Sequence, residues 1–237
     1  MTNKPKICVF DIESSHNLGF FFDVWESNIP KENIVIPWYI FCISYSWLDS
    51  NKVECINIKD FTRFKKDKHS DIEVLKEFSK IVEQADILVG HNIDRFDIKK
   101  INARLFLNNL PPMPIVKTLD TLRIAKRYFK LDYNGLDAIA KDLGCPGKLE
   151  NSKGLWRKCF EGDKKSLELM GKYNRNDVKI NKKVFERELP FIKNTLSKYF
   201  QCQNPICKSL NIRLKGIRNG KQRYCCNKCN SWGSCKI

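Results

Sequence analysis

The 237-residue sequence lacks any apolar run that approaches the roughly 20 residues needed to span a bilayer. Its N-terminus, MTNKPKICVF, also lacks the long apolar centre and small-residue cleavage site of a signal peptide. No internal repeat or low-complexity segment is present. Because 42% of the residues are hydrophobic, the chain is able to bury a core, and we expect a folded, cytoplasmic protein without a membrane partner.

Acidic residues are missing from the last part of the chain. Residues 191–237 contain ten Lys or Arg and no Asp or Glu, within a chain whose formal net charge is +16. This tail is therefore a compositional unit of its own. A balance this basic favours a polyanionic partner, most often nucleic acid.

Cysteine is distributed just as unevenly. Five of the eleven cysteines are scattered through the first 190 residues, mostly in apolar stretches, and are interpreted as buried thiols. The other six lie between positions 202 and 235. In a cytosolic protein, such a cluster indicates a metal site before disulfides, because that compartment keeps thiols reduced.

Hydrophobic periodicity predicts a mixed α/β domain. The first three strands follow one another and are expected to form an antiparallel meander. Either Ser70 or Asp71 is available to cap the first helix. Strands are expected over 6–14, 38–47, 52–60, 86–90 and 114–120, and helices over 71–85, 97–109 and 121–129, followed by helical segments from 135 that end at Pro190. We therefore expect a domain over 1–190, a linker over 191–201 and a small domain over 202–237.

Two pairs of functional side chains stand at opposite ends of the large domain. Asp11 and Glu13 lie two positions apart in the first strand, so both side chains point to one face, where paired carboxylates are costly unless a cation balances them. Tyr173 and Asp177 lie four positions apart and share a helical face. Taken singly, each pair also fits solvated surface residues.

The segment GHNIDRFD, residues 90–97, holds two further aspartates where a short strand gives way to a helix. Asp94 and Asp97 lie three positions apart, and one is able to hold a metal while the other caps the helix. Local helical phase places Asp94, rather than Asp97, on one face with Ile98 and Ile101. Two ordinary turn residues are the alternative.

These motifs, in this order, resemble the DEDD exonucleases of the RNase H-like superfamily, in the subgroup with tyrosine in the third motif. The similarity is greatest to the proofreading exonuclease domains of family B DNA polymerases. It is carried by FDIES, by NIDRFD in its Asn-x-x-x-Phe-Asp form and by YNRND, and it spans roughly residues 6–188. The opening FDIESSHNLGFFFDVWESNI, KTLDTLRIAKRYF and a C-terminal zinc ribbon also resemble a phage-encoded group, which implies the host cytoplasm as location.

The resemblance implies an RNase H-like mixed sheet and a mechanism that uses two Mg²⁺ or Mn²⁺ ions. It makes Asp97 the metal ligand and leaves Asp94 as the helix cap. Tyr173 is expected to orient the attacking water, since an ordinary phenol, with a pKa near 10, is a poor base at neutral pH. The implied metal ligands are Asp11, Glu13, Asp97 and Asp177.

Weaker expectations concern residues near these motifs. Asn92 and Phe96 are expected to line the cleft for the 3′-terminal nucleotide, although an aromatic residue beside a turn also fits the core. Asp120 is interpreted as a helix cap and His91 as a turn histidine, because His91 lies in the wrong motif to be a general base.

The tail has the spacing of a four-thiolate zinc ribbon. The pairs Cys202 and Cys207, and Cys226 and Cys229, flank an 18-residue basic stretch, and we expect them to bind one structural Zn²⁺. Cys225 and Cys235 are the alternatives as ligands. Arg223 and Tyr224 are predicted to contact substrate, because cations interleaved with aromatic residues suit phosphates and stacked bases.

The predicted function is a 3′–5′ exonuclease that releases nucleoside 5′-monophosphates, with DNA favoured over RNA. A structure-specific endonuclease and a non-catalytic nucleic-acid adaptor are the alternatives. Replication or recombination proteins are candidate partners, and the sequence leaves the oligomeric state open.

Overall fold

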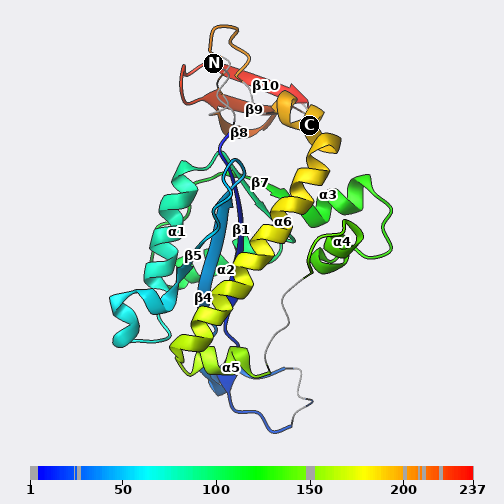
Figure 1. The fold of residues 1–237 in the computed structure, drawn as a ribbon. Coiled ribbons are helices and arrows are strands. Elements are labelled where there is room, and N and C mark those ends of the chain that lie inside the picture. Colours follow the sequence, from blue (N-terminus) through cyan, green and yellow to red (C-terminus); the bar gives the residue numbers. More distant parts are fainter. Residues whose placement is uncertain are drawn as a thin grey trace.

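The computed structural model describes residues 5–23, 25, 28–147, 153–199, 202–207, 209, 212–218 and 221–236. The chain forms a five-stranded mixed sheet flanked by helices and, toward its C-terminus, a three-stranded sheet (Figure 1). This confirms the predicted mixed α/β class. The elements are β1 (Ile7–Ser14), β2 (Leu18–Gly19), η1 (Lys31–Asn33), β3 (Ile34–Ile36), β4 (Ile40–Trp47), β5 (Glu54–Asn57), η2 (Ile58–Asp60), η3 (Thr62–Lys65), α1 (Ile72–Gln84), β6 (Ile87–Gly90), α2 (Asp97–Leu107), β7 (Lys117–Asp120), α3 (Thr121–Tyr128), α4 (Leu136–Asp142), α5 (Leu155–Phe160), α6 (Lys164–Tyr199), β8 (Ile212–Arg218), β9 (Lys221–Cys226) and β10 (Trp232–Lys236).

The central sheet has the strand order β5-β4-β1-β6-β7. β4 pairs antiparallel with both β1 and β5, which confirms the expected meander. β6 and β7 continue the sheet in parallel with β1, and a helix precedes each of them, as parallel pairing requires. The carboxyl ends of β1, β6 and β7 therefore lie at the same edge of the sheet.

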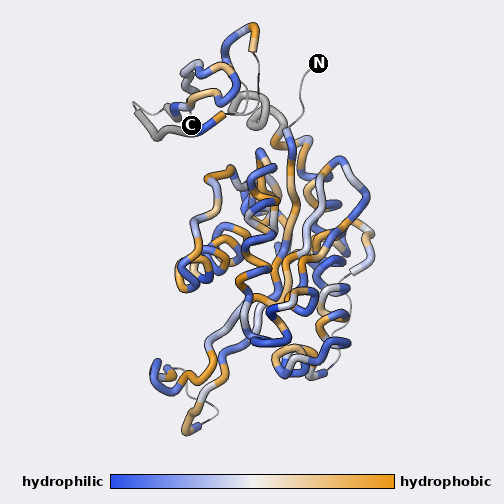
Figure 2. Tube along the Cα trace, turned by 90° about the vertical axis from the view of Figure 1, so that its left-hand side faces the viewer, coloured by the Kyte–Doolittle hydropathy of each residue, from blue (hydrophilic) through white to orange (hydrophobic). Residues whose placement is uncertain are grey.

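β1 is buried on both faces, and its alternate side chains enter different cores. Phe10 and Ile12 pack in the cluster that contains residues of α1 and α2. Ile7 and Val9 pack in a second cluster with residues of α3 and α6. Hydrophobic segments gather along these central strands in Figure 2. Because side chains alternate along a strand, the odd-numbered positions beyond Val9 also point toward α6.

A short hairpin that the periodicity did not predict connects β1 to β4. In it, β2 pairs antiparallel with β3, and the Phe20 amide donates to the Asn33 carbonyl at 2.9 Å. A Cβ at position 19 would lie 2.6 Å from that carbonyl oxygen, so the close approach of the two strands requires Gly19. The hairpin projects away from the central sheet at the bottom of Figure 1.

α6 is one helix from Lys164 to Tyr199 and contains Pro190. The expected helix end at Pro190 is therefore wrong, and residues 191–199 of the predicted linker over 191–201 are helical. Proline removes one backbone hydrogen bond from a helix interior. Packing compensates, because Ile192, just beyond the proline, is buried in the same cluster as Phe185. The domain boundary itself stays a prediction.

Asp71 occupies the N-cap position of α1, but its carboxylate does not cap the helix. It instead accepts two hydrogen bonds from the Arg104 guanidinium, at 2.7 and 2.9 Å, and one from the Ile40 amide at 3.0 Å. Asp71 is fully buried and Arg104 is nearly so. This ion pair therefore joins α1, α2 and the start of β4, and the expected capping role is wrong because a buried cation competes for the carboxylate.

Among the described residues, no helix is both long and apolar enough to cross a membrane.

We predict that Asp71→Ala lowers the free energy of unfolding by about 3–5 kcal/mol, because it leaves the buried Arg104 charge without its partner. Chemical denaturation followed by circular dichroism measures this change. The control is Glu77→Ala, which removes an exposed ion pair with Lys80 and should cost less than about 1 kcal/mol. Equal effects of the two substitutions would contradict the prediction.

A second prediction concerns Glu188 on α6, which is buried and whose carboxylate oxygens have no hydrogen-bond partner among the described residues. Burial, reinforced by the charge of Asp120, raises the pKa of Glu188 from 4.5 to about 8. The folded state thus binds a proton that the unfolded state releases, and this group's contribution to stability falls as pH rises from about 4.5 to 8. Glu188→Gln should therefore stabilise the protein more at pH 9 than at pH 5. The control is the same substitution at the exposed Glu186, and an equal dependence on pH in the two variants would contradict the prediction.

Candidate active site

Asp11 and Glu13 lie on the face of β1 that α6 covers. They follow Ile7 and Val9 in the period-two pattern, and those two side chains pack against α6 residues such as Val178. The pairing of β1 with β4 shifts register directly after Glu13, so the regular strand pairing is interrupted immediately beyond the second carboxylate. The strand therefore delivers both acids to one point beneath the helix, as the sequence predicts.

α6 brings a third carboxylate to the same point. One oxygen each from Asp11, Glu13 and Asp177 lies within 4.8 Å of the others, and Asp177 is 2% exposed. Hard carboxylate oxygens at this spacing are the ligand set of Mg²⁺ or Mn²⁺. The side chains present therefore fit a divalent cation.

The turn GHNIDRFD separates its two aspartates onto different surfaces. Asn92 adopts a left-handed conformation, with φ of 63°, and its carbonyl accepts from the amides of Arg95 and Phe96. Residues 91–96 form the turn, and α2 therefore begins at Asp97. Asp94 is not the cap of this helix, and that expectation is wrong, because its carboxylate accepts from Thr118 at 2.6 Å and from Arg123 at 2.8 Å.

Asp97 faces β1. Its Oδ1 accepts from the amide of Ile12, the residue between Asp11 and Glu13, at 3.2 Å. Asp97 is 4% exposed, and burial raises the pKa of its carboxyl to about 7, opposed by hydrogen bonds from its own amide and that of Ile12. A divalent cation at the neighbouring carboxylates would favour the ionised form. The fourth predicted ligand thus lies at the backbone of the strand that carries the first two.

Asp120 fixes the turn from the next strand. It caps α3, as predicted, by accepting from the amides of Leu122 and Arg123, and it also accepts from the Asn92 amide at 2.9 Å. His91, the predicted turn histidine, contacts the Thr121 hydroxyl at 2.9 Å. One buried carboxylate therefore holds the turn that aims Asp97.

Two neighbouring residues on α6 complete the site. Asn174 is fully buried and donates from Nδ2 to Asp11 Oδ2 at 2.7 Å. Tyr173 is 8% exposed, and its ring meets Trp156 edge-to-face with centroids 6.0 Å apart. The Tyr173 ring is therefore held by packing against α5, one helical turn before Asp177, and its role at the site stays a prediction.

A lysine lies beside the acids. Lys100 Nζ donates to Ser14 Oγ at 2.6 Å and lies 4.5 Å from the Trp38 ring centroid and 4.7 Å from that of Phe96. Burial lowers the pKa of Lys100, while the charges of Asp97 and Glu13 act in the opposite direction. Phe96, adjacent to Asp97, is 45% exposed, and substrate contact by Phe96 and Asn92 stays a prediction.

Sequence reasoning missed Asn174 and Lys100. The signal for Asn174 was present: Asn174, Asp177 and Asn181 recur at helical spacing on the face of α6 that is otherwise apolar. Lys100 carries no comparable signal, since a lysine one turn into a helix is usually solvated.

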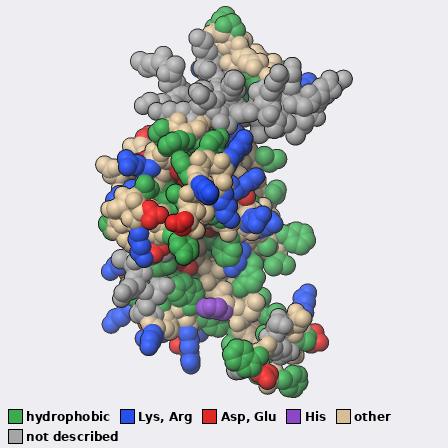
Figure 3. All heavy atoms as spheres, turned by 90° about the vertical axis from the view of Figure 1, so that its right-hand side faces the viewer, with side chains coloured by type: hydrophobic (Ala, Val, Ile, Leu, Met, Phe, Trp, Pro, Cys, Tyr) green, Lys and Arg blue, Asp and Glu red, His purple; other side chains and the backbone are tan. Residues whose placement is uncertain are grey.

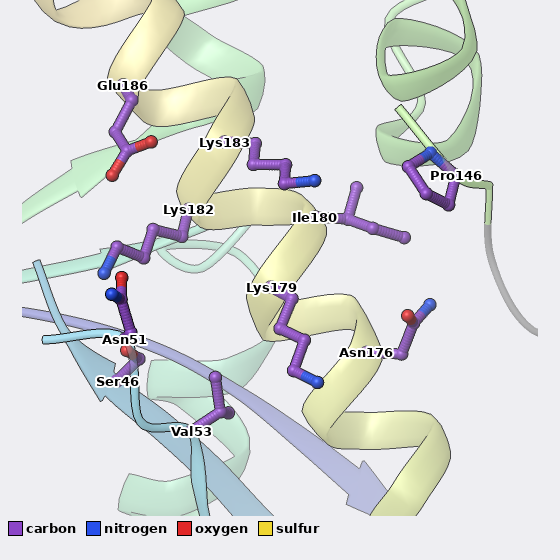
Figure 4. Close-up of a pocket in the computed structure, with 10 residues that line it drawn as sticks. All are labelled: Ser46, Asn51, Val53, Pro146, Asn176, Lys179, Ile180, Lys182, Lys183 and Glu186. Atoms are coloured by element: carbon purple, nitrogen blue, oxygen red, sulfur yellow. The ribbon is translucent and has the colours of Figure 1, made fainter. Parts of the chain in front are cut away.

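A cavity of about 300 Å³ beside α6 has different chemistry (Figure 4). Lys179, Lys182 and Lys183 line it together with one carboxylate, that of Glu186. Lys182 is committed to the fold, because its Nζ donates to the carbonyls of Trp47 and Ser50. Three lysines repel a cation, so the carboxylate cluster is the better candidate for a metal site than this cavity.

The four predicted zinc ligands come together in the C-terminal sheet. The sulfurs of Cys202, Cys207, Cys226 and Cys229 all lie within 4.8 Å of one another. This spacing fits four thiolates around one ion with Zn–S bonds of about 2.3 Å. The hydrogen bonds with Ser231 lower the pKa of Cys229 to about 6, whereas burial raises the pKa of Cys202 to about 12, so the four thiols differ in how readily they ionise.

The other ribbon residues that the sequence nominated as zinc ligands or substrate contacts have different surroundings. Cys225 Sγ lies outside the cluster, 3.7 Å from the Asn230 carbonyl, and the Cys235 side chain lies outside the described residues. Tyr224 is 2% exposed and its hydroxyl accepts from the Gln203 amide, so base stacking, which we expected, does not fit its placement. The Arg223 guanidinium instead lies 5.1 Å from the ring centroid of Trp232, which is 58% exposed.

Comparison with known proteins identifies the family of this chain. Residues 21–188 match the family model of the RNase H superfamily, a range that includes Asp97, Tyr173 and Asp177 and begins after Asp11 and Glu13. Among solved structures, the family B DNA polymerase from the hyperthermophilic archaeon Pyrobaculum calidifontis matches with a TM-score of 0.59 and 17% identity over 80% of this chain. This chain spans only 25% of that polymerase. A search of curated proteins gives no match. Because the matched residues make up most of its length, the chain belongs to the RNase H superfamily.

Proposed function

We propose that this protein is a metal-dependent 3′–5′ exonuclease that releases nucleoside 5′-monophosphates from nucleic acid, with DNA favoured over RNA. The observation that carries the proposal is the meeting of Asp11, Glu13 and Asp177 within 4.8 Å, with Asp97 hydrogen-bonded to the backbone between the first two. Membership of the RNase H superfamily and the fold shared with a DNA polymerase support a nuclease. The tyrosine subgroup and a phage-type origin belong to the same proposal.

The four carboxylates are the proposed ligands of two Mg²⁺ or Mn²⁺ ions. When bound, such a pair supplies Lewis-acid activation of the attacking water and stabilises the leaving oxygen. The chain's own contribution is to hold the ligands at fixed positions. Asn174 holds Asp11 by one hydrogen bond, and the Ile12 amide holds Asp97 by another.

In the proposed reaction, water attacks the terminal phosphodiester, a new P–O bond forms, and the bond from phosphorus to the 3′ oxygen of the preceding nucleotide breaks. The products are a nucleoside 5′-monophosphate and a strand shortened by one residue with a free 3′ hydroxyl. Tyr173 is proposed to orient the attacking water from α6, one helical turn before Asp177. Phe96, exposed at the rim, is proposed to contact the terminal base.

The alternatives predict different products. Stepwise shortening of a 5′-labelled oligonucleotide indicates an exonuclease, whereas cleavage of circular single-stranded DNA indicates a structure-specific endonuclease. An adaptor would bind without cutting. Parallel digestion of labelled single- and double-stranded DNA and RNA also decides which substrate is preferred.

We predict that Asp97→Asn lowers the rate of shortening about 100-fold or more, because a lost ligand weakens metal assistance that contributes several kcal/mol. Asparagine keeps an acceptor for the Ile12 amide, so the fold should be retained. The measurement is gel analysis of 5′-labelled DNA with Mg²⁺ or Mn²⁺.

The matched control is Asp94→Asn, whose carboxylate contacts Thr118 and Arg123 rather than the site. It should retain activity within about tenfold, since an exposed ion pair contributes at most about 1 kcal/mol. If Asp94→Asn were the inactive variant and Asp97→Asn the active one, the assignment of ligands in this turn would be overturned.

The ribbon is proposed to bind one structural Zn²⁺ through Cys202, Cys207, Cys226 and Cys229 and to help hold the substrate. Its eight Lys and Arg residues and the Arg223–Trp232 pair offer contacts to phosphates and to a base. Replication or recombination proteins stay candidate partners.

We predict that Cys226→Ser reduces bound zinc well below one ion per chain, whereas Cys225→Ser leaves it near one. The two neighbouring positions form a matched pair, because only Cys226 belongs to the sulfur cluster. Zinc is measured by atomic absorption on purified protein. Retention of zinc by Cys226→Ser together with its loss from Cys225→Ser would reverse the assignment.

A further inference from the structure

The hairpin formed by residues 18–36, here called the aromatic hairpin, exposes an unusual amount of apolar surface. Phe20 is 74% exposed, Phe22 98% and Trp25 88%. Of the seventeen large hydrophobic side chains that are exposed among the described residues, seven lie on this hairpin: Leu18, Phe20, Phe21, Phe22, Trp25, Ile29 and Val35. Figure 3 shows hydrophobic side chains on this projection, at the lower right of the molecule. Clustered apolar exposure of this kind marks an interaction surface.

The root of the hairpin is fixed beside the carboxylates. The chain leaves β1 one residue after Glu13, and the Ser15 amide donates to the Tyr39 carbonyl at 2.8 Å while the Tyr39 amide donates to Ser15 Oγ at 2.9 Å. The Trp38 amide also donates to Asn17 Oδ1 at 2.8 Å. The hairpin therefore emerges from a hydrogen-bonded base directly next to the proposed metal ligands.

Aromatic surface continues from the site to this root. The Phe96 ring, adjacent to Asp97, and the Trp38 ring, at the root, both contact Lys100 Nζ. Lys100 in turn donates to Ser14 at the end of β1. A strand whose 3′ end lies at the carboxylates would thus meet Phe96 and Lys100 first and the hairpin beyond them.

The charge of the hairpin favours contacts to bases over contacts to phosphates. Its sequence holds three acids, Asp23, Glu26 and Glu32, and one cation, Lys31, so its formal charge is −2 within a chain of +16. Phosphates are bound by cations, whereas aromatic rings bind bases of any sequence by stacking. The hairpin therefore has the chemistry of a stacking surface without phosphate contacts.

We propose that the aromatic hairpin stacks on unpaired bases of the nucleic-acid strand whose 3′ end occupies the carboxylate site. This inference rests on the proposed exonuclease function and specifies its substrate. The strand is held by its bases on the hairpin side. Phosphate contacts are left to other surfaces of the protein.

The test compares binding of a fluorescent single-stranded 20-mer by anisotropy, with every protein carrying Asp97→Asn to prevent cleavage. Adding Phe20→Ala and Trp25→Ala together should weaken binding on the order of 10- to 100-fold, since each lost base–aromatic stack is worth a substantial factor in affinity. The slope of log affinity against log salt should stay unchanged, because no phosphate contact is lost. The control, Phe106→Ala with Ile115→Ala, removes two equally exposed side chains outside the hairpin and should bind normally.

A 20-mer with abasic sites separates stacking from other causes. It should bind the parent protein as weakly as the intact 20-mer binds the hairpin variant, and the variant should not distinguish the two strands. Unchanged affinity of the hairpin variant would overturn the proposal, as would a changed salt slope. Loss of self-association in the variant with unchanged affinity would do the same and assign the hairpin to a second copy of the chain.

Failure of the hairpin proposal and failure of the exonuclease proposal give different results. If the wild-type protein shortens 3′ ends while the hairpin variants bind normally, only the hairpin proposal fails. If the wild-type protein does not cut but the hairpin variants bind weakly, the exonuclease proposal fails and base stacking by the hairpin stands.

Discussion

Repulsion between carboxylates is the constraint on which this structure depends. Two unit charges about 5 Å apart repel by about 3 kcal/mol at an effective dielectric of about 20, and Asp11, Glu13 and Asp177 form three such pairs. Nothing local to β1 or α6 favours that arrangement. It is imposed by the packing of Ile7 and Val9 against α6, and a divalent cation would convert the cost into binding energy. Apolar packing between β1 and α6 therefore keeps the three carboxylates close to one another.

The turn after β6 solves a second problem, because a one-turn error would send the wrong aspartate to the site. Local helical phase favours Asp94, yet the left-handed Asn92 and the hydrogen bonds from Asp120 delay the start of α2 to Asp97. Asp94 is drawn to the other side by Arg123. The choice between the two acids is thus made by a carboxylate that lies 23 positions beyond Asp97 in the sequence.

α6 links the carboxylate site to the C-terminal part of the chain. It carries Asn174 and Asp177 at the site, and it continues beyond Pro190 because Ile192 is packed in the core. The aromatic hairpin leaves the same site in another direction, directly behind the second carboxylate of β1. In the two binding proposals, the aromatic hairpin contacts the bases of the nucleic-acid strand, and cationic surfaces such as the ribbon contact its phosphates.

The sequence by itself determined what repeats at short range. Period-two spacing placed Asp11 and Glu13 on one face, and the cysteine pairs predicted the sulfur cluster, because geometry within a strand or a knuckle follows from neighbouring residues. Only the tertiary structure decided which contacts form across the chain. The hydrogen bond from Asn174 to Asp11 joins residues 163 positions apart, and the burial of Tyr224 depends on the strand that covers it. Such contacts are set by how elements pack, and no local pattern encodes packing between distant elements.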